Sequence, residues 1–261
     1  MKTKLLFLSV FLSVNLFGQN VYIPDANFKN YLVNNFLINT SGDNEIQVSE
    51  ASSFTGAILC NDLSISDLTG IEAFTALTYL VCYNNQLTSL DISNNTALTL
   101  LSFSNNQIIS LDLSNNAFLT DLYCEYNQLT SLDVSNNTVL IRLHCFFNQL
   151  ECLNIKNGNN HNMIIFLADA NPNLTCIEVD DAGYSSAMWF NNDYAFDPQT
   201  SFSENCNNDC STATATTIEL TSSKNLIQIL DLMGRETSFK PNTPLIYVYD
   251  NGSTEKVFTI E

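Results

Sequence analysis

Three aspartates have a spacing that could support acid–base chemistry. Asp91, Asp112 and Asp133 recur every 21 residues. If the segments that carry them stack like strands, neighbouring carboxylates lie roughly 5 Å apart, and paired carboxylates can act as general acid and base. Each aspartate also opens a D-x-S-N-N segment, where Asp commonly accepts backbone hydrogen bonds at a turn. We therefore interpret this column as structural.

Other catalytic motifs are missing from the sequence. No two of the eight glycines lie closer than 14 residues apart, which excludes GxGxxG, the P-loop and GxSxG. Cys206 and Cys210 are the closest pair of cysteines, so there is no CxxC motif. The only two histidines, His144 and His161, lie too far apart in the sequence to form HExxH. We predict that the protein is not an enzyme and needs no catalytic cofactor.

The charge balance restricts the partners. Lys and Arg number 9 and Asp and Glu number 27, which gives a net charge of −18. Such a chain repels phosphate backbones. We predict that nucleic acid is not a partner.

The first segment, 1–19, reads as a secretory signal peptide. Lys2 and Lys4 precede an apolar run from Leu5 to Phe17, which is too short to span a bilayer. An N-terminal anchor helix is the alternative. No transmembrane segment is expected after cleavage, so the mature chain should be secreted or displayed at the outer surface, where disulfides are allowed.

A repeat defines the fold class. The template LxxLxCxxNQLxxLD(I/L/V)SNN recurs in four register-matched copies. Its alternating apolar positions predict short strands in each half of the repeat. We predict a right-handed leucine-rich repeat solenoid over 57–180, with about six coils. Its first-strand leucines are Leu80, Leu101, Leu122 and Leu143.

Two columns of the repeat point inward. Cys82, Cys124 and Cys145 share one register with Phe103, and buried reduced thiols there would act as small apolar groups. Disulfides between coils are the alternative. Asn85, Asn106, Asn127 and Asn148 form the other column, with amides expected to bond the backbone of adjacent coils.

The remaining cysteines lie at or beyond the far end of the array. We predict a disulfide between Cys176 and Cys206, which would tie the cap to the last coil. Cys152–Cys176 is the rival pairing, because these residues share a register in adjacent coils.

Outward positions beside the cysteine column carry a cluster of aromatic residues. Such clusters are common at binding surfaces, although some could instead fold under the C-terminal cap. The flanking positions also include Ser102 and Ser104. The predicted binding residues are Val81, Tyr83, Tyr123, Glu125, Tyr126, His144, Phe146 and Phe147.

The segment 20–56 reads as a small helical N-terminal cap. Asp25 is its expected N-cap, and Phe28, Tyr31, Leu32 and Phe36 are expected on one apolar face.

The loop 39–50 matches a degenerate EF-hand frame. It departs from the frame by Asn39 at the first position and Asn44 in place of Gly. A cap loop without metal is the alternative. The predicted calcium ligands are Asn39, Ser41, Asp43, Glu45 and Glu50.

The C-terminal part divides into three segments. Residues 181–210 hold the only Trp and are expected to cap the last coil, and 211–217 form a polar linker. Residues 218–261 should form a small β domain with strands at 226–231, 244–250 and 255–260. Asp250-Asn251-Gly252 is a hairpin signal between the last two.

These segments resemble two known families. LTSLDVSNNTVL and the cysteine column resemble the cysteine-ladder internalins, bacterial leucine-rich repeat surface proteins. The resemblance covers about 57–180 and implies a module that recognises an extracellular protein or glycan. LIQILDLMGRET and PLIYVYDNGSTEKVFTIE resemble the type IX secretion sorting domain. That resemblance implies contact between 218–261 and the secretion machinery, while a plain C-terminal β cap is the alternative for this segment. The alternative function for the whole chain is a structural or adhesion-matrix surface protein without a discrete ligand.

Overall fold

The computed structural model describes residues 19–189, 194–207, 210, 226–230, 245–249 and 254–257. It divides the chain into two compact units, Met1–Thr214 and Ala215–Glu261. This division falls inside the expected linker. Residues 1–18 of the predicted signal peptide and residues 211–217 lie outside the described residues.

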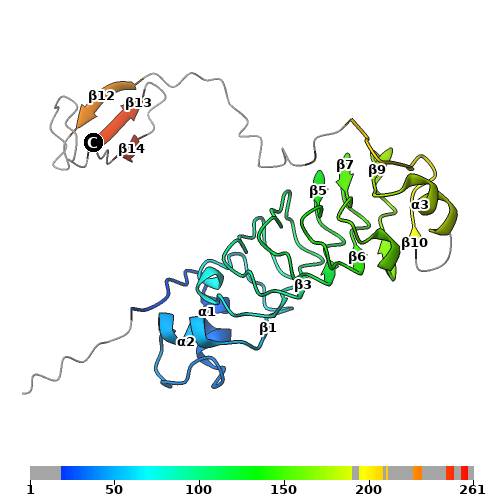
Figure 1. Ribbon diagram of the computed structural model, residues 1–261. Coiled ribbons are helices and arrows are strands. Elements are labelled where there is room, and N and C mark those ends of the chain that lie inside the picture. Colours follow the sequence, from blue (N-terminus) through cyan, green and yellow to red (C-terminus); the bar gives the residue numbers. More distant parts are fainter. Residues whose placement is uncertain are drawn as a thin grey trace, which may run out of the picture. The chain divides into compact units, whose positions relative to one another are not determined.

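The first unit is a leucine-rich repeat solenoid. Its coils stack from the helices α1 and α2 to the helix α3 (Figure 1). Seven parallel strands form one sheet along it, in the order β1-β2-β3-β4-β6-β8-β10. The strands are β1 (Ala57–Leu59), β2 (Tyr79–Val81), β3 (Leu100–Ser102), β4 (Asp121–Tyr123), β6 (Arg142–His144), β8 (Ile165–Leu167) and β10 (Tyr194–Ala195).

A second parallel sheet follows the other half of the repeat. It contains β5 (Ser131–Asp133), β7 (Cys152–Asn154), β9 (Cys176–Glu178) and β11 (Ser201–Ser203). The prediction of a second strand in every repeat is therefore partly wrong, because 88–92 and 109–113 form none. Ile92 and Leu113 are nevertheless buried there. Apolar spacing sets which side chains point inward, but it does not by itself align backbone groups for a ladder.

The core is a continuous stack of leucines. Leu80, Leu101, Leu122 and Leu143 are each 0% exposed and lie in register on neighbouring strands. Burial of one such side chain contributes roughly 1.5–3 kcal/mol. A single short coil cannot bury its own leucines, so the stacking of coils supplies the core.

The asparagine column joins adjacent coils, as expected. Asn127 Nδ2 donates to the carbonyl oxygens of Phe103 (3.1 Å) and Cys124 (3.2 Å), and its Oδ1 accepts from Ile108 N (3.0 Å). The same arrangement recurs at Asn106 and Asn148. These amides satisfy backbone groups that the turns leave without a ladder partner.

The N-terminal cap contains α1 (Ala26–Val33) and α2 (Val48–Ser53), and the first coil adds the 3-10 turn η1 (Ile71–Ala73). Asp25 is the N-cap of α1, as expected, since its carboxylate accepts from Phe28 N at 3.0 Å. The same carboxylate accepts from Ser66 N at 2.9 Å, 41 residues further along the chain. One side chain therefore starts the helix and fixes it to the first coil.

The expected apolar face of α1 is only partly correct. Phe28 and Leu32 are fully buried, but Phe36 is 80% exposed. The helix ends at Val33, and the following turn brings Ile38 N to Asn35 O at 2.9 Å. Because the turn redirects the chain, Ile38 occupies the core and Phe36 points outward.

The C-terminal cap continues the coil without the repeat sequence. It consists of α3 (Ala182–Met188) with β10 and β11, which pair with β8 and β9. Trp189 is 1% exposed and packs against Phe166 and Phe202, at centroid distances of 5.5 and 5.4 Å. The only Trp thus covers the last coil.

Two disulfides fasten this cap. The structure joins Cys176 to Cys206, the pair predicted from the sequence, and Cys152 to Cys210. The rival Cys152–Cys176 pair is not formed, although the two cysteines stand at the same position of the paired strands β7 and β9. Each sulfur bonds instead to the segment that follows β11. The last two coils are therefore both linked to the end of the cap.

The second unit contains three antiparallel strands, β12 (Leu226–Leu230), β13 (Leu245–Tyr249) and β14 (Thr254–Val257), in that order. They agree with the three strands predicted for this segment. The expected turn Asp250-Asn251-Gly252 lies outside the described residues.

No helix among the described residues combines the length and the apolar character that crossing a bilayer requires.

Candidate functional site

The candidate site lies on the outer face of the seven-stranded sheet. In each three-residue strand of this sheet the middle apolar residue points into the core, so its neighbours point away from it. Val81, Ser102, Tyr123, His144 and Leu167 form one aligned row across β2, β3, β4, β6 and β8.

Five aromatic side chains gather on the coils of β4 and β6. We call them the aromatic patch: Tyr123, Tyr126, His144, Phe146 and Phe147. Tyr123 and His144 meet edge to face with centroids 4.8 Å apart, and Phe146 lies edge-on to Tyr126 at 5.4 Å. Tyr126 and Phe147 stack with centroids 4.7 Å apart and planes 10° apart. Contacts of this kind order the rings against one another.

Two rings of the patch stand on unusual backbone. Tyr126 has φ 55° and Phe147 has φ 50°, while the equivalent positions in earlier coils are Asn84 and Asn105, each at φ 54°. Asn visits this left-handed region readily, but a bulky residue there is an outlier. The strain costs on the order of 1 kcal/mol per residue. The rings are nevertheless 44% and 50% exposed, so core packing does not account for them.

Polar groups beside the patch are incompletely paired. Glu125 Oε2 and His144 Nε2 are buried, and neither has a hydrogen-bond partner among the described residues. Burial lowers the pKa of His144, although the negative charges of Glu125 and Asp121 act to raise it. Arg142 pairs with Asp121 at 2.7 Å on the same face. Unpaired polar groups of this kind are costly in a free protein.

The predicted binding residues do not form one continuous set. Val81 and Tyr83 are half-buried on the coil of β2, separated from the patch by the coil of β3. The outward serines of that middle coil are buried, with Ser102 9% and Ser104 5% exposed. The expectation that they form part of an exposed face is wrong, because small side chains are covered in a row of larger ones.

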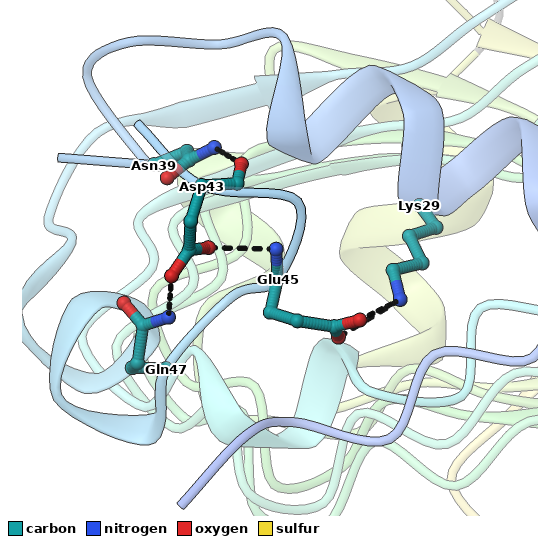
Figure 2. Close-up of polar contacts among 5 residues, drawn as sticks. All are labelled: Lys29, Asn39, Asp43, Glu45 and Gln47. Atoms are coloured by element: carbon teal, nitrogen blue, oxygen red, sulfur yellow. Dashed lines mark hydrogen bonds and ion pairs between the residues drawn. The ribbon is translucent and has the colours of Figure 1, made fainter. Parts of the chain in front are cut away.

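The 39–50 loop is held by hydrogen bonds between its own residues (Figure 2). Asp43 accepts from Glu45 N at 2.7 Å and from Gln47 Nε2 at 3.0 Å. The carboxylate of Glu45 pairs with Lys29 at 2.7 Å, and Asn39 Nδ2 donates to Asp43 O at 2.7 Å. The candidate calcium ligands therefore already have protein partners.

The remaining oxygens of the loop are engaged in the same way. Asn39 Oδ1 accepts from Ser41 Oγ at 3.0 Å and from Gly42 N at 2.9 Å. Burial of Glu50 opposes its ionisation, but hydrogen bonds from Gln47 N, Ser41 N and Thr40 outweigh this and lower its pKa. No three His, Cys, Asp or Glu side chains of the described residues group as metal ligands. These hydrogen bonds close the loop through its own residues.

Neither chemical column of the repeat forms a reactive site. Each aspartate of the column accepts a hydrogen bond from the backbone N–H two residues later, which is the turn role favoured from the sequence. The pairs are Ser93 N to Asp91 (3.0 Å), Ser114 N to Asp112 (2.9 Å) and Ser135 N to Asp133 (2.8 Å). Cys82, Cys124 and Cys145 are free, as expected for reduced thiols. Cys60 is free as well, and all four are 0% exposed. Burial raises the pKa of Cys60 to about 12 and raises those of the other three. Protonated buried thiols are poor nucleophiles.

Sequence reasoning missed two features of this region. The buried amides of Asn95, Asn116 and Asn137 form a second asparagine column, visible in the sequence only as the SNN of each repeat. The left-handed backbone of Tyr126 and Phe147 had a clearer signal, since both stand where the repeat otherwise has Asn.

The fold and these columns define a leucine-rich repeat protein with a cysteine ladder. No known protein family profile matches the chain. Internalin J from Listeria monocytogenes serotype 4b (strain F2365) is 38% identical over 77 residues, which are 29% of this chain and 8% of that protein. The chain is therefore similar to Internalin J over part of its length, and it spans less than a tenth of that relative's length.

Three solved structures are also similar to parts of this chain. The functional domain of InlJ from Listeria monocytogenes, which includes a cysteine ladder, is 30% identical with a TM-score of 0.46, over 62% of this chain and 38% of that one. The internalin InlF of L. monocytogenes strain 4b F2365 is 19% identical with a TM-score of 0.44, over 67% of this chain and 56% of its own. Internalin C2 of the same strain is 16% identical with a TM-score of 0.42, over 72% and 92%.

Proposed function

We propose that this protein is a recognition module that binds an extracellular protein or glycan through the aromatic patch. The observation that carries this proposal is the left-handed backbone of Tyr126 and Phe147. Two consecutive coils replace a well-suited Asn with a large aromatic residue and leave the ring exposed. Backbone strain beneath half-exposed side chains is a common mark of a functional site.

The composition of the patch suits binding rather than catalysis. Exposed Tyr and Phe rings that are already ordered by stacking lose little freedom when a partner covers them. The aspartate column is occupied by turn hydrogen bonds, and the free thiols are buried. The chemistry of the described residues therefore supports a role without catalysis.

We also propose that the protein acts outside the cell or at the outer surface. The predicted signal peptide 1–19, the two disulfides and the similarity to Internalin J support an extracellular location. The sorting-like segment 218–261 would direct export by a type IX-like route through contact with the secretion machinery.

The test of binding compares two matched double variants. Tyr126→Asn with Phe147→Asn removes both exposed rings and restores the residue of the earlier coils. Ile109→Asn with Phe118→Asn removes two similarly exposed apolar side chains outside the patch, 55% and 64% exposed. Targets captured by the unaltered protein on a glycan array or from surface-protein extracts should be lost only in the first variant. Equal capture by both variants would place recognition elsewhere.

A further inference from the structure

A second candidate site lies on the N-terminal cap and shares no residue with the aromatic patch. Helix α1 buries Phe28 and Leu32. Beside that buried face it carries Asn27, Asn30, Tyr31 and Asn34 at helical spacing, and Tyr31 also packs against the core. Together with Asn35, Phe36 and Leu63 from the first coil, this stripe lines an open cavity of about 500 Å³. Cavities of roughly 300–1,000 Å³ are typical of small-molecule sites.

The chemistry of the lining is uncharged. Four of its seven residues are Asn, and none is acidic or basic, although the chain has a net charge of −18. Each amide offers two N–H donors and a carbonyl oxygen with two lone pairs. A charged ligand would find no counter-charge in this lining, and a wholly apolar ligand would leave the amides unpaired. The cavity is therefore suited to a neutral ligand that both donates and accepts hydrogen bonds.

The polar side chains are held in place before any ligand arrives. Asn34 Nδ2 donates to the backbone and side-chain oxygens of Asn30 at 2.8 and 2.9 Å. Asn27 Nδ2 donates to Ser64 O at 3.2 Å, which joins the helix to the loop on the other side of the cavity. Tyr31 accepts from Leu59 N at 2.8 Å. These bonds use only part of the capacity of each amide, so oriented donors and acceptors are left for a ligand.

Phe36 adds an aromatic surface next to these amides. Phe36 lines the cavity and is 80% exposed, so its ring does not gain the free energy that burial would give it. An aromatic face packs well against the C–H face of a sugar ring, while the sugar hydroxyls pair with amides as donors and acceptors. We infer that this cavity binds a neutral carbohydrate. A peptide backbone has similar polar groups, but it does not present a flat C–H face to the ring of Phe36.

The inference is tested by NMR on the purified full-length protein. The probes are the methyl glycosides of glucose, galactose, mannose and N-acetylglucosamine, and their disaccharides. At least one should shift the side-chain amide signals of Asn30 and Asn34 with a dissociation constant at or below about 1 mM. Phe36→Ala should weaken this binding at least about tenfold. Tyr22→Ala is the matched control, since Tyr22 is 74% exposed but does not line the cavity.

Three outcomes would overturn the inference. They are a panel in which no sugar shifts these amides, equal effects of Phe36→Ala and Tyr22→Ala, and a neutral Gly-Ala peptide that shifts the amides where the sugars do not. Asn30→Asp keeps both oxygens that accept from Asn34 Nδ2 but adds charge, and should weaken sugar binding without unfolding the cap. The Tyr126→Asn, Phe147→Asn variant should bind the same sugar normally, which separates this site from the aromatic patch.

Discussion

The carboxylate of Glu50 accepts a hydrogen bond from Ser41 N at 2.7 Å and so closes the 39–50 loop from its last residue. Its other oxygen accepts from Gln47 N at 2.9 Å, at the start of α2. One side chain thus links the first half of the loop to the start of α2.

We expect Glu50→Gln to destabilise the protein by about 1–2 kcal/mol, because a charged acceptor of backbone N–H groups is lost. The decrease in melting temperature should be the same with and without millimolar calcium. Calorimetry in calcium and in chelator measures this. A melting temperature that rises with calcium in the unaltered protein but not in the variant would establish a metal site instead.

The same carboxylate should make stability depend on pH. Its pKa is lowered from the ordinary value of 4.5 in the folded protein. A lowered folded pKa stabilises the fold above the unfolded pKa, and this contribution is lost as the pH falls through the folded value. Chemical denaturation from pH 6 to about pH 3 should therefore show a smaller loss of stability in Glu50→Gln. Parallel pH curves for the two proteins would contradict this.

The thiols of the cysteine ladder should resist modification until the protein unfolds. Cys60, Cys82, Cys124 and Cys145 are buried, and burial raises their pKa values. Iodoacetamide followed by mass spectrometry should detect no adducts on the native protein. After denaturation without reductant it should detect labelling of these four and not of the disulfide-bonded cysteines. Thiols that stay blocked after denaturation would mean that the ladder is oxidised.

Asn127 should be among the most sensitive polar positions of the array. Asn127→Ala leaves several buried backbone groups unpaired, with an expected cost of about 2–4 kcal/mol. Asn127→Asp should cost at least as much, since it replaces donors with a charge beside carbonyl oxygens. Gln128→Ala, at an exposed neighbour, should change the free energy of unfolding by less than about 0.5 kcal/mol. Urea denaturation gives the free energy of unfolding of the three variants. Equal values would show that the asparagine column does not stabilise the fold.

The left-handed backbone at Tyr126 predicts which of two substitutions there leaves the protein more stable. Tyr126→Asn and Tyr126→Ala lose the same ring contacts, but Asn tolerates φ 55° better. The Asn variant should be more stable by about 0.5–1 kcal/mol. At Tyr83, which has no positive φ, the Asn and Ala variants should lack this difference. Thermal denaturation of the four variants tests the assignment, and an Ala variant at least as stable as Asn at position 126 would refute it.

The end of the first unit predicts where the chain can be shortened. Ending the chain just after Cys210 keeps both disulfides, so the melting temperature should match that of the full chain. Ending it before Cys206 removes both bridges and should cost about 2–5 kcal/mol or more. Differential scanning calorimetry of the two truncated chains measures this difference. Equal stability of the two would show that the bridges do not stabilise the cap.

The same shortening tests the export proposal in the native host. A chain that ends just after Cys210 should pass the inner membrane but stay in the periplasm, if 218–261 is a sorting signal. Cell fractionation would detect this. Normal recovery of the shortened chain outside the cell would remove the sorting role.

The solenoid could be predicted from the sequence because the same pattern of residues recurs every 21 positions. A 21-residue repeat places the same residue type at the same point of each coil, so the period alone assigns Leu122, Cys124 and Asn127 to the interior, where all three are buried. Such columns report burial directly, since each side chain packs against the residue at the same position of the next coil.

The tertiary structure decided what depends on the meeting of distant or irregular segments. It paired Cys152 with Cys210, turned Phe36 outward after α1, and satisfied the oxygens of Glu50 from within its own loop. It also stacked Tyr126 on Phe147 in a left-handed backbone. Sequence spacing records which side of an element faces the core, but hydrogen-bond, disulfide and ring partners depend on distances and angles that exist only once the coils and the cap are packed.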